Sequence, residues 1–405
     1  MSGSQSSPGK YGTAKVKPMT LKRPGRCRQK SFNWAGQQHV LLGGIKCFAP
    51  PPLDEQHAQP PCPLELSGLY YFSWRTFRFL VCCEMKAIRV ASFGGPEVLQ
   101  CVEVPSPQPA HGEVLIRVRA IGVNPVDLYI RAGTYPAKPN LPYTPGTDAA
   151  GEVVAVGDGV HTVAVGDRVY TTGTVSGAYA ELALCSFDQV WSLPKETSFA
   201  QGAALSVPYT TAYKALFIRA KAQRGETVLV HGATGGVGLA AVQFARSAGI
   251  HVLGTGGTPE GLKLLSAEGA EQVFDHHAPD YTDAIMAATD GRGVDIIIEM
   301  LANINLQQDL TLLAKYGRIV IVGSRGKTEI DPRALMRSEG QILATMSATK
   351  EERATAQAAI RIGLENKSLR PIISKEFPLS QAAAAHQAVL ASKAPGKIIL
   401  DPAKI

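Results

Sequence analysis

A run of glycines between a strand-like and a helix-like segment gives this sequence its clearest chemical signal. Residues 228–249 read VLVHGATGGVGLAAVQFARSAG, and the apolar residues after the glycines recur at helical spacing. The start of a helix presents unpaired N–H groups and a partial positive charge, which suit a pyrophosphate. We therefore expect this corner to bind an adenine dinucleotide.

The corner departs from the G-x-G-x-x-G fingerprint because Ala233 takes the place of the first glycine. Gly235 still allows the main chain to approach the phosphates, and Gly238 allows the helix to pack closely against the strand. Ala233 is compatible with the turn if its φ is negative. The alternative is a glycine-rich turn that packs tightly and binds nothing, but the six strand-like segments described below favour the dinucleotide.

The second strand of the pattern indicates which dinucleotide is bound. It ends in LGTGGTPEGLK, where Gly256, Gly257 and Thr258 replace the acidic residue that usually binds the adenosine ribose of NAD. An acid here would repel a 2′-phosphate. Its absence, with Lys263 close behind, favours NADPH, although Lys263 alone would equally fit an exposed helix lysine.

The sequence lacks the ligand pattern of a catalytic zinc, which needs three protein ligands of Cys, His or carboxylate type. Zinc alcohol dehydrogenases carry a Cys where this chain has Asn124, and their Gly-His-Glu segment is replaced by Gly146, Thr147 and Asp148. The sequence has no four-cysteine cluster for a structural zinc. We therefore predict no metal, and a substrate that accepts hydride without a Lewis acid, such as a quinone or a conjugated enone.

Asn124, Tyr129 and Tyr135 are the predicted catalytic residues. They lie in AIGVNPVDLYIRAGTYP, in loops that we expect to face the nicotinamide. Amide and phenol groups can hydrogen-bond a developing oxyanion, while orientation and desolvation of the two reactants lower the barrier further. The alternative is that both tyrosines only pack in a wall of the site.

Two domains are expected to position these residues. From Met85 to about Val207, period-two strands separated by Gly, Pro and Asp predict a mostly antiparallel β domain. Apolar strands then alternate with helical stretches, which predicts an α/β fold with a doubly wound parallel sheet. The six strands are expected at residues 227–231, 250–255, 272–275, 294–299, 318–323 and 341–345. We assign 85–207 and 346–405, including a returning last strand GKIILDP, to the catalytic domain and 208–345 to the cofactor domain.

Residues 1–84 differ from the rest in charge. They hold 11 basic and 4 acidic residues and so carry the whole formal charge of +7, which leaves 85–405 neutral. We predict a disordered basic extension, with a mitochondrial transit segment as the alternative. Only Cys101 and Cys185 follow it, which fits a reducing compartment. With no unbroken apolar span of membrane length, we expect a cytoplasmic protein, or a mitochondrial one if 1–84 is a transit segment.

Several motifs together resemble a known family over residues 85–400. They are GGPEVL, GVNPVDLYIRAGTYP, LPYTPGTDAAG, GDRVYTTGTVSGAYAE, VPYTTAYKAL, VLVHGATGGVGLAA, DIIIEMLANINL and VGSRG. As a set they are similar to the zinc-free quinone oxidoreductases of the medium-chain dehydrogenase/reductase superfamily, the group of zeta-crystallin. The segment QILATMSATKEE is about one residue shorter than usual, which leaves local contacts near the nicotinamide open.

The resemblance implies an NADPH-dependent quinone reductase with a GroES-like catalytic domain and a Rossmann cofactor domain, assembled as a homodimer or homotetramer. It also implies cofactor contacts at Tyr129, Thr234, Gly235, Gly236, Val237, Gly257, His276, Asn305, Val322, Gly323, Ser324 and Arg325. The assignment of His276 rests on the resemblance alone, since a lone histidine would otherwise be an ordinary surface residue.

Two other functions stay open. A reductase of enone or alkenal double bonds needs the same cofactor geometry. A protein of another class would bind AU-rich mRNA, or serve as an abundant soluble protein, and use NADPH as a stabilising ligand. The resemblance suggests the RNA role, but the neutral balance of residues 85–405 gives no electrostatic support for it.

Overall fold

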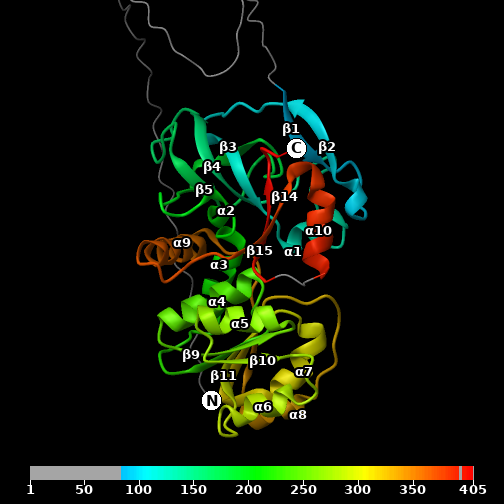
Figure 1. The fold of residues 1–405 in the computed structure, drawn as a ribbon, viewed down its shortest axis with the longest axis vertical. Coiled ribbons are helices and arrows are strands. Elements are labelled where there is room, and N and C mark those ends of the chain that lie inside the picture. The colour runs from blue at the N-terminus through cyan, green and yellow to red at the C-terminus, as the bar shows by residue number, and fades with distance from the viewer. Residues whose placement is uncertain (1–83, 392–394, 405) are drawn as a thin grey trace, which may run out of the picture. The chain divides into compact units, whose positions relative to one another are not determined.

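The computed structural model describes residues 84–391 and 395–404, so the predictions for the first 83 residues lie outside the described part. The described chain forms a six-stranded sheet, a seven-stranded sheet and a two-stranded hairpin (Figure 1). No helix among the described residues is long and apolar enough to cross a membrane.

The six-stranded sheet is parallel throughout and has the strand order β10-β9-β8-β11-β12-β13. Its strands are β8 (Thr227–Val230), β9 (His251–Gly256), β10 (Gln272–Asp275), β11 (Val294–Glu299), β12 (Leu313–Ile321) and β13 (Gln341–Ala344). This is the doubly wound order, and its direction reverses between β8 and β11, where such folds bind dinucleotides. The predicted α/β fold is therefore confirmed.

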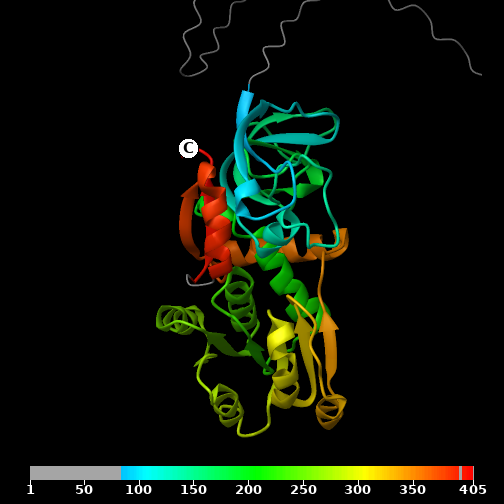
Figure 2. The ribbon, with the colours of Figure 1, turned by 90° about the vertical axis from the view of Figure 1, so that its right-hand side faces the viewer.

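The central parallel strands β8, β9 and β11 are buried on both faces, which explains their largely apolar sequences. Val228 and Val230 of β8 face one hydrophobic cluster, which includes Leu239 and Phe244 of a helix on that side. Leu229, between them, faces a second cluster, which includes Leu306 and Leu310 of a helix on the other side. Helices therefore cover both faces of the sheet (Figure 2).

The helices connect the strands and begin at sequence signals that are easy to recognise. Thr258 and Thr349 cap two helices by accepting backbone N–H bonds from Gly261 and Glu352, as N-cap threonines do. The helices are α1 (Pro125–Arg131), α2 (Phe199–Gly202), α3 (Ser206–Tyr213), which continues into the π-helical η3 (Lys214–Arg219), α4 (Gly236–Ser247), α5 (Pro259–Glu268), α6 (Tyr281–Ala287), α7 (Ala302–Leu312), α8 (Pro332–Ser338), α9 (Lys350–Glu365) and α10 (Ala382–Ala391).

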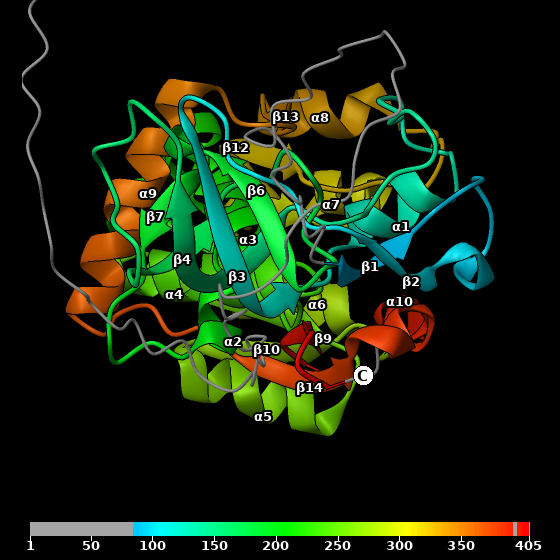
Figure 3. The same cartoon turned by 90° about the horizontal axis from the view of Figure 1, so that it is seen from above.

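The seven-stranded sheet is mostly antiparallel and contains the last strand of the chain. Its strands are β3 (Glu113–Gly122), β4 (Asp148–Val156), β5 (Arg168–Thr171), β6 (Leu182–Ser186), β7 (Val190–Ser192), β14 (Ile373–Pro378) and β15 (Lys397–Asp401), while β1 (Glu84–Arg89) and β2 (Gln100–Pro105) form the hairpin. β15 pairs antiparallel with β3, so the final strand returns to the first sheet, as predicted. Helix α10 packs in the same core as β1 (Figure 3).

One strand differs from its prediction at its start. We expected the fifth strand of the parallel sheet at residues 318–323, but β12 begins at Leu313. Tyr316 within it has a φ of 64°, and the pairing of β12 with β11 shifts register here. A left-handed residue in a strand has no period-two signature, so the sequence pattern marks only the regular second half.

Candidate functional site

The glycine-rich corner lies between β8 and α4, at the point where the sheet order reverses. Gly232 supplies the left-handed residue of the turn, with a φ of 54°. Ala233 is buried and does not have a positive φ, which meets the condition set from the sequence. A Cβ built on Gly235 would find only the Gly232 carbonyl oxygen, 3.8 Å away. The space above Gly235 is therefore open to a ligand.

Gly238 has a different role, because it brings α4 against the turn. A Cβ at this position would lie 2.5 Å from the Ala233 Cα, a distance that side chains do not adopt. The helix N-terminus can therefore sit directly behind the turn. Gly236 and Val237 form the first turn of α4, where the backbone N–H groups are free to bind an anion.

The end of β9 joins this corner. The Cγ2 atom of Thr234 lies against the main chain of Gly256, 3.1 Å from a Cβ built there. Gly257 comes next, and a Cβ there would be 2.7 Å from the Nε2 atom of His276. Burial lowers the pKa of His276, and the neighbouring His277 lowers it further. The structure thus brings together three of the predicted cofactor residues, from three different strand ends.

Lys263 lies on α5 with an exposed side chain. Among the described residues it forms no ion pair. Its ammonium group is therefore available to a 2′-phosphate, and it equally fits an ordinary surface lysine. No carboxylate occupies the end of β9, where Gly256, Gly257 and Thr258 follow one another.

The remaining predicted cofactor residues follow β11 and β12. The side-chain amide of Asn305 donates to both carboxylate oxygens of Glu299, at 3.2 and 3.3 Å. The backbone N–H groups of Val322 and Gly323 donate to the Glu299 carbonyl oxygen at 2.8 and 3.3 Å. Ser324 and Arg325 follow with exposed side chains, so this segment borders the same edge of the sheet.

A buried cluster of titratable groups lies behind this edge. The His231 Nε2 atom is 2.9 Å from Asp309 Oδ1 and 4.0 Å from Glu299 Oε2, and all three side chains are excluded from solvent. The contact with Asp309 lies outside hydrogen-bond geometry. Burial raises the pKa of Glu299 to about 7, and the two carboxylates hold the pKa of His231 above its usual value against the effect of burial. Glu299 and His231 therefore each hold a proton more readily than exposed side chains of their kind.

Asn124 lies at the N-terminus of α1 and is 1% exposed. Its Nδ2 donates to Asp148 Oδ2 at 2.9 Å and its Oδ1 accepts a hydrogen bond from the Lys397 ammonium. A second, longer Nδ2 contact of 3.5 Å reaches the Gly122 carbonyl oxygen. Both ends of the Asn124 amide are therefore bonded to protein groups. The amide orients these neighbours and has no free N–H group for a substrate.

Lys397 is the residue of this network that the sequence reasoning missed. It was noted only as part of the strand GKIILDP, and its sequence contains no signal for burial of its charge. The Nζ atom lies 3.5 Å from Asp148 Oδ2, and burial lowers the pKa of Lys397 while Asp148 opposes that effect. Burial raises the pKa of Asp148, and Lys397 opposes it. The Lys397 side chain thus lies beside Asn124 and Asp148 in a buried polar network.

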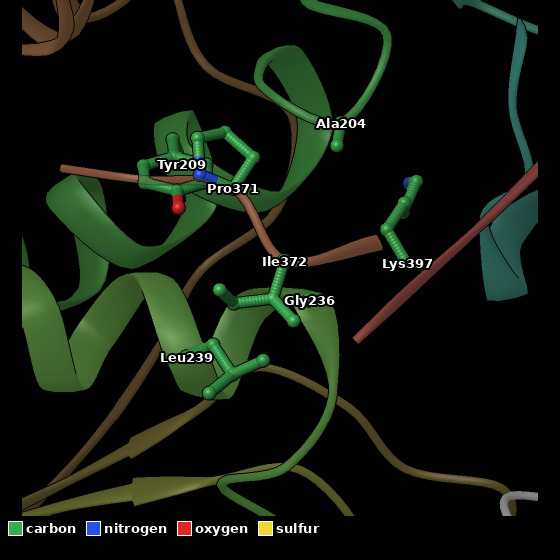
Figure 4. Close-up of a pocket in the computed structure, with 7 residues that line it drawn as sticks. All are labelled: Ala204, Tyr209, Gly236, Leu239, Pro371, Ile372 and Lys397. Carbon is green, nitrogen blue, oxygen red and sulfur yellow. The ribbon is translucent and has the colours of Figure 1, made fainter. Parts of the chain in front are cut away.

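The strand that carries Lys397 also contacts the cofactor corner. The Gly396 N–H donates to the Thr234 carbonyl oxygen at 2.8 Å, and Gly235 and Gly396 form a parallel bridge. A small pocket at this junction is lined by Lys397 and Gly236, with Tyr209 nearby (Figure 4). One strand end therefore links the dinucleotide corner to the Asn124 network.

Tyr129 and Tyr135 are held together by the backbone. The N–H of Tyr135 donates to the Tyr129 carbonyl oxygen at 3.2 Å, and the N–H of Thr134 donates to the same oxygen at 3.0 Å. Both rings are half-buried. Within the described part of the chain, neither phenol hydroxyl has a hydrogen-bond partner, so both can serve a ligand.

A cavity of about 670 Å³ opens in the catalytic domain. Its walls include Asp127, Tyr143 and Thr147, none of which the sequence reasoning selected as a site residue. Asp127 is 3% exposed, and burial raises the pKa of its carboxyl group to about 7. Asp127 is the third residue of α1, and its carboxylate accepts the Asn124 N–H at 2.9 Å, as the third residue of a capping box does.

Comparison with known proteins assigns the two sheets to known domain families. Residues 110–195 match the alcohol dehydrogenase GroES-like domain, and residues 236–362 match the zinc-binding dehydrogenase family. The name of the second family refers to zinc, whereas the ligand positions considered above are occupied by Asn124 and Thr147. The GroES-like and Rossmann domains expected from the sequence are confirmed.

Curated relatives are closely similar over nearly their whole length. The quinone oxidoreductase of Homo sapiens is 50% identical over 320 residues, covering 78% of this chain and 97% of the relative, and that of Rattus norvegicus is 51% identical over 322 residues, with the same coverage. The solved structure of Escherichia coli quinone oxidoreductase complexed with NADPH aligns with a TM-score of 0.70 at 30% identity, covering 79% of this chain and 99% of that chain. The chain therefore belongs to the quinone oxidoreductases of the medium-chain dehydrogenase/reductase superfamily.

Proposed function

We propose that this protein is an oxidoreductase that uses NADPH to reduce quinones without a metal. The observation that carries the proposal is the combination at one sheet edge of an unobstructed glycine corner at Gly235 and a second strand that ends without a carboxylate. The relatives named quinone oxidoreductase, and the Escherichia coli structure with NADPH, support the same assignment.

The proposed cofactor site comprises residues that follow β8, β9, β10, β11 and β12, together with Tyr129 of α1. They are Tyr129, Thr234, Gly235, Gly236, Val237, Gly238, Gly257, Lys263, His276, Asn305, Val322, Gly323, Ser324 and Arg325. The helix α4 N-terminus would receive the pyrophosphate, and Lys263 would pair with the 2′-phosphate. We assign residues 208–345 to this cofactor domain and residues 85–207 and 346–405 to the catalytic domain.

In the proposed mechanism, the bound cofactor supplies the hydride and the protein supplies orientation. Tyr129 and Tyr135 offer phenol hydroxyls that could hydrogen-bond the oxygen on which negative charge develops. Asn124 acts as a positioning residue, because its amide joins Asp148 to Lys397. The Lys397 side chain donates to Asn124 and lies 3.5 Å from Asp148 Oδ2, so it helps to hold this network in place.

Steady-state kinetics test this assignment. We expect turnover of ortho-quinones with NADPH, and a larger thermal shift with NADPH than with NADH, because a ligand that binds the native state stabilises it. Turnover of 2-alkenals with none of ortho-quinones would instead establish the double-bond reductase. Binding of AU-rich RNA that survives loss of NADPH binding in a Gly235→Trp variant would support the binding-protein alternative.

We further propose that the enzyme is a cytoplasmic homodimer or homotetramer. The edge strand β13 has no neighbour on its outer side in the described chain, and an open edge favours pairing with a second copy. Cys101 and Cys185 are unpaired, which fits a reducing compartment. Light scattering of the purified chain tests the assembly, and fractionation of cells tests the location.

A further inference from the structure

The buried cluster of His231, Glu299 and Asp309 has no part in the proposed mechanism, although it lies behind the cofactor edge of the parallel sheet. Each of the three side chains is at most 3% exposed. The His231 Nε2 atom and both carboxylate oxygens of Asp309 have no hydrogen-bond partner among the described residues. Buried polar groups are normally hydrogen-bonded, so this cluster calls for an explanation.

The charges of the cluster do not balance when all three groups are ionised. Two carboxylates then face one imidazolium, which leaves one negative charge uncompensated and away from solvent. In the part of the chain that the structure describes, no Lys or Arg side chain forms an ion pair with Glu299 or Asp309. A buried charge without a partner is costly, and such sites take up a proton instead. One proton added to the cluster brings its net charge to zero.

The surrounding titratable groups place this proton exchange near neutral pH. Burial raises the pKa of Glu299 to about 7, where Asp309 acts in the same direction and His231 opposes it. Burial acts to lower the pKa of His231, but the two carboxylates hold it above its usual value. Tyr281 of α6 faces both carboxylates and stays neutral, because burial raises its pKa. His276, after β10, is the remaining titratable group that faces His231.

His231 connects the cluster to the glycine-rich turn. It directly precedes Gly232, and a single hydroxyl holds the ring and the turn together. The Thr255 Oγ1 atom lies 3.3 Å from His231 Nδ1 and accepts the Gly232 N–H at 3.0 Å. The space above Gly235, where we place the phosphates, opens from the same turn. The imidazole therefore lies behind the backbone on which the anionic part of the cofactor would rest.

Glu299 connects the cluster to the other cofactor segments. Its carboxylate accepts the Leu301 N–H and the Asn305 side-chain amide, the latter at 3.2 and 3.3 Å. Its carbonyl oxygen accepts the N–H groups of Val322 and Gly323. The strand that it ends, β11, lies beside β8 where the sheet order reverses. Both sides of the dinucleotide site are thus attached to one buried cluster.

We propose that the cluster of His231, Glu299 and Asp309 takes up a proton when NADPH binds, which makes it a proton-linked part of the cofactor site. The inference rests on the proposed function, because it needs the dinucleotide at Gly235. The phosphates bring negative charge to an edge that already holds buried carboxylates, so the bound state favours the protonated cluster. The proton comes from solvent and returns to it when the cofactor leaves. Because linkage is reciprocal, NADPH affinity must fall as pH rises.

Calorimetric titration of the full-length protein with NADPH measures this proton directly. Titrations at pH 8 in HEPES and in Tris, which have different ionisation enthalpies, give the number of protons taken up. We expect uptake of up to about one proton per NADPH, and a several-fold rise of Kd from pH 7 to pH 9. This range lies above the titration of the 2′-phosphate at about pH 6. It also lies above that of His276, whose pKa is lower than its usual 6.5.

Two variants assign the proton to the cluster. Glu299→Gln is neutral at every pH and keeps an acceptor for the Leu301 N–H. We expect less proton uptake in this variant and tighter NADPH binding than wild type at pH 9, which a damaged fold would not produce. Asp309→Asn removes a carboxylate that raises the pKa of Glu299. The rise of Kd should therefore begin at lower pH, and the uptake at pH 8 should fall.

Glu271→Gln is the matched control, because Glu271 also pairs with a histidine. Its Oε1 lies 2.9 Å from His251 Nδ1, but both side chains are exposed. His251 is the first residue of β9, so this pair lies at the opposite edge of the sheet from the cofactor corner. The variant should keep the proton uptake and the pH dependence of the wild type.

A wild-type protein that binds NADPH without proton uptake between pH 7 and pH 9 would overturn the inference while leaving quinone reduction in place. Undiminished uptake in both Glu299→Gln and Asp309→Asn would overturn it as well, since the proton would then bind outside the cluster. A protein that binds no NADPH at any pH would overturn the proposed function itself.

Discussion

Single buried residues determine how this protein responds to pH. Burial raises the pKa of Glu299 from 4.5 to about 7, so the native state holds a proton that the unfolded chain releases. The stability from this group is fully present below about pH 4.5 and is lost as pH rises through about 7. In Glu299→Gln the loss is absent, so the stability of the variant relative to wild type should rise by up to about 3 kcal/mol between pH 5 and pH 8.

Urea unfolding at the two pH values measures this difference. Glu376→Gln is the matched control, because its carboxylate is exposed and 3.7 Å from the Lys404 ammonium. The control should differ from wild type by the same amount at both pH values. A Glu299→Gln difference that does not vary with pH would show that Glu299 is ionised throughout.

A second prediction at the scale of single residues concerns Lys397, which lies beside the buried Asp148 carboxylate and compensates its charge. Lys397→Met leaves the Asp148 carboxylate without its cation, which typically costs about 3–5 kcal/mol. Adding Asp148→Asn should recover much of that loss, since the uncompensated charge is then removed. Thermal unfolding of the two single variants and the double variant completes the cycle. Additive losses would mean that the two side chains do not interact.

At the scale of elements, two glycines of the corner between β8 and α4 have different roles: Gly238 matters for folding and Gly235 for ligand binding. Gly238→Ala places a methyl group 2.5 Å from the Ala233 Cα, so α4 must move, at a cost of about 1–3 kcal/mol that outweighs the gain in helix propensity. In Gly235→Ala the new methyl group meets no protein atom closer than 3.8 Å, and the backbone φ of −79° is one that alanine adopts readily. The fold should therefore tolerate this substitution.

The two variants should therefore differ in their response to NADPH. Gly235→Ala is expected to keep its Tm and to bind NADPH at least tenfold more weakly, because its methyl group fills the space open to the phosphates. Gly238→Ala is expected to have a lower Tm and to bind NADPH more weakly as well. Calorimetric titration with NADPH and thermal unfolding check the pair, and tight binding by Gly235→Ala would place the pyrophosphate elsewhere.

The same elements show how far the sequence could predict the structure. The strands of the parallel sheet were predicted within a few residues, apart from the start of β12, because their buried apolar runs are local signals. The burial of Lys397 and Asp127, and the place of Tyr143 and Thr147 in the cavity wall, were not predicted, since each depends on segments that only the fold brings together. Asn124 was selected for its position, but its amide is committed to Asp148 and Lys397, which only the folded chain shows.

The whole molecule has a hydrophobic core that belongs to both sheets. One cluster contains Ala150 and Tyr170 of the catalytic sheet together with Val228 and Val252 of the cofactor sheet. Because both sheets contribute side chains to this cluster, neither can unfold without disrupting the other. We therefore expect a single cooperative unfolding transition for residues 84–405. NADPH should move that transition as a unit, by about 2.7 kcal/mol at a concentration of 100 Kd. Differential scanning calorimetry of the full chain measures it, with van't Hoff and calorimetric enthalpies compared. Two transitions, of which NADPH moves only one, would mean that the shared core does not couple the domains.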